Sequence, residues 1–252
     1  NLLIQKETLL KLLSSPYLFY RSKKVFSLDI AFLPRNIVTL SMIGIVDYNA
    51  GNIKSVERAL SFLNCEYVIS KNPSELKNAD KLIFPGVGEA KYAMEQLNKT
   101  GFDIFLKDFA DSQKPLLGIC LGSQIIFDYS EEGDVNCLGL IKGKIKHFDN
   151  VLEKNCLNEN GLKYKIPHMG WNNLEFIKPE DKIFTNIDKN ASFYFVHSYL
   201  IQPDEEDVIL ATADYGVKVP SAIKSNNIYA FQFHPEKSGE WGLKLLQNFI
   251  NL

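Results

Sequence analysis

Leu116-Leu117-Gly118-Ile119-Cys120-Leu121-Gly122-Ser123-Gln124 is the stretch from which the fold of this chain can be worked out. Its first four residues are apolar or small and predict a short buried strand. A bend carrying Cys120 follows, and then a helix running through Ile125, Ile126 and Phe127. Because Gly118 and Gly122 stand two residues either side of Cys120, the pattern is the cysteine form, G-x-C-x-G, of a strand–turn–helix nucleophile elbow.

The spacing of the two glycines has a physical reason. A nucleophile at the apex of a strained turn needs small neighbours, since a Cβ two residues away would crowd the backbone or the substrate. The helix that follows points free N–H groups and its positive dipole end at the sulfur, which favours thiolate over thiol. The alternative interpretation is a buried cysteine that only fills space in the core.

Short strands alternate with helical patterns from residue 42 to residue 119. Asn52 is the expected cap of the first helix, and Asn72-Pro73 opens a short second one. Such alternation predicts a three-layer α/β fold with a mostly parallel sheet, in which reactive groups gather at the carboxyl ends of the strands. The expected strands are residues 43–46, 67–69, 81–84 and 116–119, and the expected helices are residues 53–63, 90–97 and 102–109.

The second half of the chain has a different pattern. Residues 192–200 and 228–233 alternate aromatic and β-branched side chains, as strands do, and residues 240–249 predict a closing helix. We expect these shorter, partly antiparallel strands to extend the same domain, which then covers residues 42–252. Residues 1–41 are mixed apolar and basic, and Met42 directly precedes the first clear strand. We interpret them as a poorly ordered or non-native extension, with a transit peptide or amphipathic anchor as the alternative.

The composition excludes several classes of function. The 252 residues are 46% apolar and 23% charged with a net charge of −2, which gives no reason to expect nucleic acid or an anionic membrane as a partner. No run approaches the roughly 18 apolar residues of a membrane span. The four cysteines are scattered without a C-x-x-C pair, so the sequence predicts neither a disulfide framework nor a metal site, and a cytoplasmic location fits best.

A thiolate nucleophile needs a base and a group that orients the base. His234 follows the predicted strand 228–233, and Glu236 lies two residues later, beyond Pro235. Proline breaks the strand, so both side chains can turn towards one site at its end. The segment 85–88, with Gly86 and Gly88, can present backbone N–H groups to an oxyanion, although it could also be an ordinary strand-to-helix turn.

These motifs together resemble a known family. Residues 118–124 with residues 234–238 resemble the class I (triad) glutamine amidotransferases, which have a flavodoxin-like three-layer fold. Within that family, residues 85–88, 166–172 and 195–199 resemble the glutaminase subunits of imidazole glycerol phosphate synthases, from histidine biosynthesis. The resemblance covers Met42 to Leu252, with all motifs in the expected order.

The resemblance implies a role for each motif residue. Cys120 would attack the side-chain amide of L-glutamine to form a thioester and release ammonia, with His234 as base and then acid, and Glu236 orienting it. The N–H groups of Leu121 and, after a peptide reorientation, Val87 would hold the oxyanion. The glutamine contacts would be Gly88, Gln124, Ser198 and Tyr199. No cofactor and no metal are implied.

The family couples such a glutaminase to a separate (β/α)8-barrel cyclase that receives the ammonia through a sheltered channel. This sequence has no eight-fold βα repeat, so the cyclase would be another polypeptide and the pair a heterodimer. We expect a polar-flanked loop to form the docking surface, because a Trp and a Met in such a loop suit an interface. The expected docking residues are His168, Met169, Trp171 and Asn172, with Asn49 as a weaker candidate.

Three alternatives stay open at this point. A paralogous subunit could supply ammonia for sugar amidination in surface polysaccharide synthesis. A cysteine hydrolase or peptidase on the same scaffold would need no partner, and would leave residues 167–172 without a purpose. A non-catalytic binding subunit would have no use for an intact Cys120, His234 and Glu236.

Overall fold

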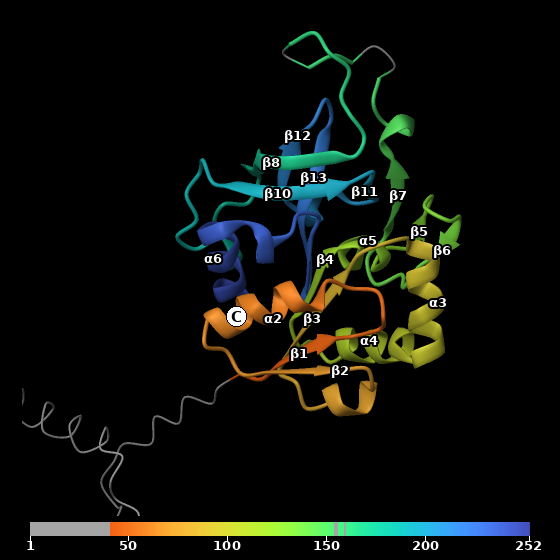
Figure 1. The fold of residues 1–252 in the computed structure, drawn as a ribbon, viewed down its shortest axis with the longest axis vertical. Coiled ribbons are helices and arrows are strands. Elements are labelled where there is room, and N and C mark those ends of the chain that lie inside the picture. Colours follow the sequence, from red (N-terminus) through yellow and green to blue (C-terminus); the bar gives the residue numbers. More distant parts are fainter. Residues whose placement is uncertain (1–40, 154–155, 159) are drawn as a thin grey trace, which may run out of the picture. The chain divides into compact units, whose positions relative to one another are not determined.

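Figure 1 shows a central sheet with helices on both of its faces, in the computed structural model of this chain. The structure describes residues 41–153, 156–158 and 160–252. Apart from Ser41, the extension predicted over residues 1–41 lies outside the described residues. Within them, eight strands form the central sheet in the order β2-β1-β3-β4-β14-β13-β12-β9.

The first five strands of that order run parallel, as the sequence predicts. Apolar side chains alternate between the two faces of these strands, which explains why helices cover both. The strands are β2 (Tyr67–Ser70), β1 (Ile43–Val46), β3 (Lys81–Gly86), β4 (Leu116–Cys120) and β14 (Ile228–Phe231). The helices that connect the first four are α2 (Ile53–Phe62), the 3-10 turn η1 (Pro73–Leu76), α3 (Ala90–Thr100) and α4 (Phe102–Asp111).

The second half of the chain continues the sheet with antiparallel strands, again as expected. β13 (Lys218–Ser225) pairs with β14, β12 (Ile209–Asp214) pairs with β13, and β9 (Glu175–Phe176) closes the edge. β14 therefore has a parallel neighbour on one side and an antiparallel one on the other. This strand joins the two halves of the sheet, and the chain continues from it into η5 (Pro235–Lys237) and α6 (Gly239–Ile250).

Two smaller sheets complete the described part of the chain. β8 (His168–Asn173) pairs antiparallel with β10 (Ser192–His197), from Ser192 opposite Asn173 to His197 opposite His168. The other sheet has the order β11-β7-β5-β6. Its strands are β11 (Tyr199–Pro203), β7 (Gly143–His147), β5 (Tyr129–Ser130) and β6 (Val135–Asn136).

The central sheet separates two hydrophobic cores. On one face, Val46, Leu82 and Phe84 pack with buried residues of α3 and α4. On the other, Ile45 and Ile83 pack with buried residues of α2 and α6. The two-residue period of the strands divides their apolar side chains between these cores. Among the described residues, no helix is long and apolar enough to cross a membrane.

Three local predictions are wrong. The elbow helix α5 covers only Leu121–Ile125, because the carbonyls of residues 125–127 accept hydrogen bonds from the N–H groups of residues 138–140 instead of continuing the helix. Asn52 stands before α2 but makes no side-chain cap hydrogen bond, since its ψ of 61° is not the extended conformation of a capping residue. Residues 168–172, expected to lie in a loop, belong to strand β8 (His168–Asn173).

Candidate active site

Cys120 lies at the junction of β4 and α5, in the conformation of an elbow. Its φ of 54° and ψ of −113° lie outside the regions that non-glycine residues favour. The Oγ of buried Ser123 donates to the Cys120 carbonyl at 2.6 Å and holds the bend from within. Such a conformation persists only where the surrounding structure enforces it, and it occurs mainly at functional sites.

The glycines on either side of Cys120 are required by close packing. A Cβ on Gly122 would lie 2.0 Å from the carbonyl oxygen of Phe84, on the neighbouring strand β3. A Cβ on Gly118 would lie 2.8 Å from the Gly122 carbonyl oxygen. The elbow is therefore pressed against β3, whose Gly86 pairs with Cys120 in register. This packing brings the segment after Gly86 beside the sulfur.

His234 reaches the same place from the adjacent strand β14. Its Nδ1 donates to Glu236 Oε1 over 2.8 Å, and the two side chains are only 2% and 1% exposed. The His234 backbone is fixed to β10, because its N–H donates to the Tyr194 carbonyl at 2.9 Å. With Nδ1 bound to a carboxylate, the ring can act through Nε2, which is buried and has no hydrogen-bond partner among the described residues.

The surroundings of His234 favour its protonated form. Burial by itself would lower the pKa of His234, but the interactions with Cys120 and Glu236 outweigh it and raise the pKa to about 9. Cys120 therefore lies beside His234, although no hydrogen bond joins its sulfur to Nε2 among the described residues. The three side chains are of the types that a nucleophile, a base and an orienting carboxylate require.

Cys120 and His234 open into one cavity of about 320 Å³. Six of the other residues predicted for the site line this cavity: Val87, Gly88, Leu121, Gln124, Ser198 and Tyr199. The seventh, Glu236, does not line the cavity and lies behind His234. Gln124 is fixed in its wall, because its Nε2 donates to the Tyr199 carbonyl and to Gln232 Oε1, each at 2.9 Å. Both amide hydrogens are thus used, and the side-chain oxygen Oε1 is left to accept from a ligand.

Five further residues that line the cavity were not predicted from the sequence: Glu132, Pro167, Val196, His197 and Lys237. Glu132 is the most informative of these, since it brings a carboxylate to a small polar cavity. Burial, together with Glu89, raises the pKa of Glu132 although the N–H of Ala90 donates to its Oε2 at 2.9 Å. Glu132 lies on a turn between two-residue strands, where no periodic pattern marks a functional side chain.

The residues predicted for docking divide between two faces of β8. Met169 and Trp171 are 61% and 58% exposed, whereas His168 is 2% exposed and so cannot lie on a docking surface. The two-residue period of a strand separates odd from even positions, which a loop would not do. Asn172 is half-buried on the inner face, where its Nδ2 donates to the Asp214 carbonyl at 2.8 Å. Asn49 is exposed in the loop after β1 and accepts from Lys71 Nζ at 2.7 Å.

The described residues contain no group of three or more His, Cys, Asp or Glu side chains arranged to hold a metal ion. Their four cysteines are free thiols.

Comparison with known proteins identifies the family. The sequence profile of the family described as Glutamine amidotransferase class-I matches residues 44–252. Curated relatives named Imidazole glycerol phosphate synthase subunit HisH, from Geobacillus sp. (strain WCH70), Methanocaldococcus jannaschii and Bacillus subtilis (strain 168), are 47%, 44% and 43% identical over 212 residues. Each alignment covers 84% of this chain, and 97%, 100% and 96% of those relatives respectively.

Solved structures share the fold at lower identity. PurLQS from Thermotoga maritima matches with a TM-score of 0.60 and 19% identity, over 83% of this chain and 97% of that one. A structure described as a glutamine amidotransferase matches with a TM-score of 0.63 and 17% identity, over the same shares. The elbow cysteine with its histidine and carboxylate, the family profile and the similarity to the HisH subunits lead to one conclusion: this chain belongs to the class-I glutamine amidotransferases, in the family of imidazole glycerol phosphate synthase subunits.

Proposed function

We propose that this chain is the glutaminase subunit of an imidazole glycerol phosphate synthase and hydrolyses L-glutamine to glutamate and ammonia. The observation that carries the proposal is the meeting of the Cys120 elbow with the His234–Glu236 pair at one cavity. A volume of about 320 Å³ lies at the small end of ligand sites, which suits a free amino acid better than a peptide.

In the first half-reaction, Cys120 Sγ attacks the amide carbon of the glutamine side chain. The carbonyl becomes an oxyanion, for which the backbone N–H groups of Leu121 and Val87 are the candidate donors, since both residues line the cavity. His234, protonated at Nε2, gives its proton to the leaving nitrogen. The C–N bond then breaks, ammonia leaves, and a γ-glutamyl thioester stays on Cys120.

In the second half-reaction, neutral His234 takes a proton from a water molecule, which attacks the thioester carbonyl. The C–S bond breaks, glutamate leaves, and the Cys120 thiolate and the His234 imidazolium are restored. Glu236 accepts from Nδ1 in both steps and keeps that nitrogen protonated, so that Nε2 is the nitrogen that gives and takes protons.

The cavity offers complementary groups for the free amino-acid end of glutamine. Glu132 suits the α-ammonium group, and Lys237 suits the α-carboxylate, because each brings the opposite charge to the cavity wall. Gln124 Oε1 adds a neutral acceptor. Gly88, Ser198 and Tyr199 complete the wall against which the side chain of the substrate would lie.

A synthase subunit implies a partner subunit. We infer that the partner is a (β/α)8-barrel cyclase that takes up the ammonia, because ammonia released into water would be diluted and protonated. The exposed side chains of Met169 and Trp171 on β8 suit the docking contact. A cytoplasmic site of action stays a prediction.

The experiment that tests this function is the substitution Cys120→Ser in the complex with the partner cyclase. We expect at least a roughly 10³-fold loss of glutamine-dependent synthesis, because a serine hydroxyl is a far weaker nucleophile than a thiolate. Synthesis from added ammonium salts should be unchanged, since the cyclase uses ammonia from either source. The measurement is the rate of product formation with each nitrogen source.

A parallel loss with both nitrogen sources would show that Cys120 is structural and not nucleophilic. Wild-type chain assayed with and without the partner provides the second arm. Strong stimulation by the partner is expected, whereas equal glutaminase activity alone would contradict the coupled subunit and favour an independent hydrolase.

A further inference from the structure

A line of hydrogen bonds runs from β8 to the wall of the glutamine cavity. It starts at Asn172, whose Nδ2 lies 2.8 Å from the Asp214 carbonyl and 3.3 Å from His168 Nε2. His168 Nδ1 lies 3.0 Å from His197 Nε2. His197 Nδ1 in turn lies 2.7 Å from the Tyr199 carbonyl, which is the oxygen that also accepts from Gln124 Nε2.

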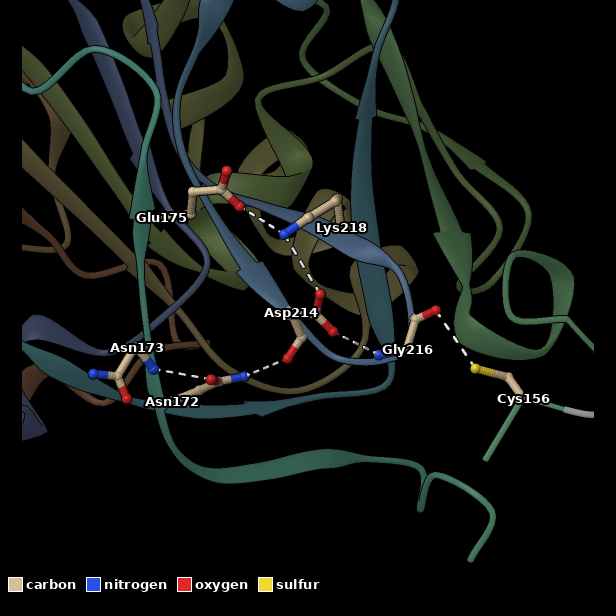
Figure 2. A network of polar contacts seen from close by, with 7 residues as sticks. All are labelled: Cys156, Asn172, Asn173, Glu175, Asp214, Gly216 and Lys218. Atoms are coloured by element: carbon tan, nitrogen blue, oxygen red, sulfur yellow. Dashed lines mark hydrogen bonds and ion pairs between the residues drawn. The ribbon is translucent and has the colours of Figure 1, made fainter. Parts of the chain in front are cut away.

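The two ends of this line determine where every proton lies. The Tyr199 carbonyl can only accept, so His197 Nδ1 must donate, and His197 Nε2 is left as an acceptor. His168 Nδ1 therefore donates to it, and His168 Nε2 accepts from Asn172. The Asn172 amide must donate both hydrogens, one to His168 Nε2 and one to the Asp214 carbonyl at the end of β12. Figure 2 shows the bond from Asn172 to the Asp214 carbonyl.

Both histidines are neutral in this arrangement. Burial lowers the pKa of His168 to about 4, and burial together with the nearby His168 lowers the pKa of His197 to about 3. Neither ring is needed as a base, because His234 occupies that position. Their carbons pack as aromatic surface: His168 stacks on Phe195 and Tyr215 at ring distances of 4.6 and 4.0 Å.

We propose that His168 and His197, each fixed as the Nδ1–H tautomer, are positioning residues that hold the Tyr199 carbonyl and, through it, Gln124 in the glutamine-binding arrangement. The inference rests on the proposed function. Neither ring donates to or accepts from the substrate. The pair acts by supplying a second donor to the carbonyl that Gln124 Nε2 also binds, and so fixes the part of the cavity wall that carries Gln124.

Two substitutions of His168 separate its hydrogen bond from its packing. His168→Phe keeps the stacked ring and removes the donor, which leaves His197 Nε2 buried without a partner. His168→Asn loses the ring but places an amide N–H near the former Nδ1. In the complex with the partner, we expect the KM for glutamine to rise about tenfold in His168→Phe with kcat unchanged, because a tenfold rise corresponds to the loss of one hydrogen bond. In His168→Asn we expect a smaller rise.

A KM close to that of the wild type in His168→Phe, with a larger rise in His168→Asn, would mean that the ring of His168 only packs. This result would overturn the proposal. A fall in kcat at unchanged KM would overturn it as well. Absence of glutaminase activity in the wild type would instead refute the proposed function.

A direct readout does not depend on activity or on the stability of a variant. In full-length chain labelled with ¹⁵N-histidine, imidazole nitrogen shifts report which nitrogen carries the proton. We expect both rings to show protonated Nδ1 and unprotonated Nε2 at neutral pH, the rarer tautomer for a free imidazole. A protonated Nε2 on either ring would break the line of donors and refute the assignment.

Discussion

Gly122 bears the strictest packing constraint of any residue at the catalytic elbow. A Cβ at this position would lie 2.0 Å from the Phe84 carbonyl oxygen, a contact with backbone that no rotamer change can relieve. A side chain there would push α5 away from β3, and with it the N–H of Leu121. We therefore expect the glycine to determine both the stability of the elbow and the position of the Leu121 N–H, the proposed oxyanion donor.

The substitution Gly122→Ala tests this constraint. We expect a loss of about 2–3 kcal/mol in the free energy of unfolding, as in an overpacked core, measured by urea denaturation. Gly51→Ala is the matched control, because its Cβ would lie 3.1 Å from the Pro85 carbonyl oxygen, a much milder contact than the 2.0 Å at Gly122. Equal losses in the two variants would contradict the constraint.

The raised pKa of His234 predicts a pH dependence. A histidine whose pKa rises from 6.5 to about 9 on folding stabilises the protein fully below pH 6.5, and that contribution disappears as the pH rises through 9. In the proposed mechanism the imidazolium protonates the leaving nitrogen, and its population falls in the same range, so kcat for glutamine should fall above pH 9. Pre-steady-state release of ammonia against pH is the measurement.

The variants Cys120→Ser and Glu236→Gln provide the control for that titration. Each removes a partner that raises the pKa of His234, so NMR titration should show a lower value in both. A pKa of His234 unchanged in both variants would mean that His234 does not interact with the other two.

At this scale the sequence predicts the residues that stand in motifs and misses those that do not. Cys120 and His234 are predicted because an elbow and a strand end have recognisable chemistry, and both residues line one cavity. Glu132 is missed, because a glutamate on a turn looks solvated until distant strands close the cavity around it. His168 is placed wrongly, since a polar residue in a polar stretch gives no sign that Phe195 and Tyr215 enclose it.

At the scale of elements, the side chains of β8 alternate between two faces with different surroundings. Its even positions carry His168 and Asn172 inward, and its odd positions carry Met169 and Trp171 outward. The inner face takes part in the hydrogen-bond line, and the outer face is free for a partner. Because β10 pairs with the whole length of β8, the outward side chains stand on a rigid element.

The double substitution Met169→Ala with Trp171→Ala should weaken binding of the partner cyclase at least about tenfold, since large exposed anchors dominate such interfaces. The melting temperature of the isolated chain should change little, because both side chains are more than half exposed. Titration calorimetry measures the affinity. Phe62→Ala on α2, where Phe62 is 72% exposed, is the control and should bind as wild type.

The elements themselves could be predicted largely from periodicity. β1, β3, β4, α2, α3, α4 and α6 lie close to the expected ranges, because each has a buried stripe or run of its own. β8 could not be predicted in this way, because its pattern of polar and aromatic residues depends on pairing with β10. The short α5 follows from hydrogen bonds to residues 138–140, which no local pattern reveals.

At the scale of the whole molecule, two hydrophobic cores pack on the two faces of one central sheet. One half of that sheet is parallel and the other half is antiparallel. The parallel direction of the first strands was predictable from the alternation of strands and helices. The return of the chain to form β14 beside β4 was not predictable in this way. That return places His234 next to Cys120 although the two are far apart in sequence. Global topology, and not any local motif, therefore assembles the site.

A chain that begins at Met42 should fold and work as the full chain does. As far as the structure describes the chain, the two cores beside the central sheet, the cavity and strand β8 consist of residues after Met42. The Met42 backbone also pairs with Asp80, so it needs to be kept. Circular dichroism, melting temperature and glutaminase activity in the complex are the measurements, and a large loss in any of them would refute the interpretation of residues 1–41 as an extension.

The placement of Cys120 and His234 on neighbouring strands has a consequence for heat resistance. Their separation is set by the spacing of β4 and β14 within a sheet, about 4.8 Å, and by a short turn anchored to β10. Warming that loosens surface segments leaves such a pair together, so turnover should survive until the sheet itself comes apart. We therefore expect glutaminase activity and the secondary structure of the central sheet to be lost at the same temperature.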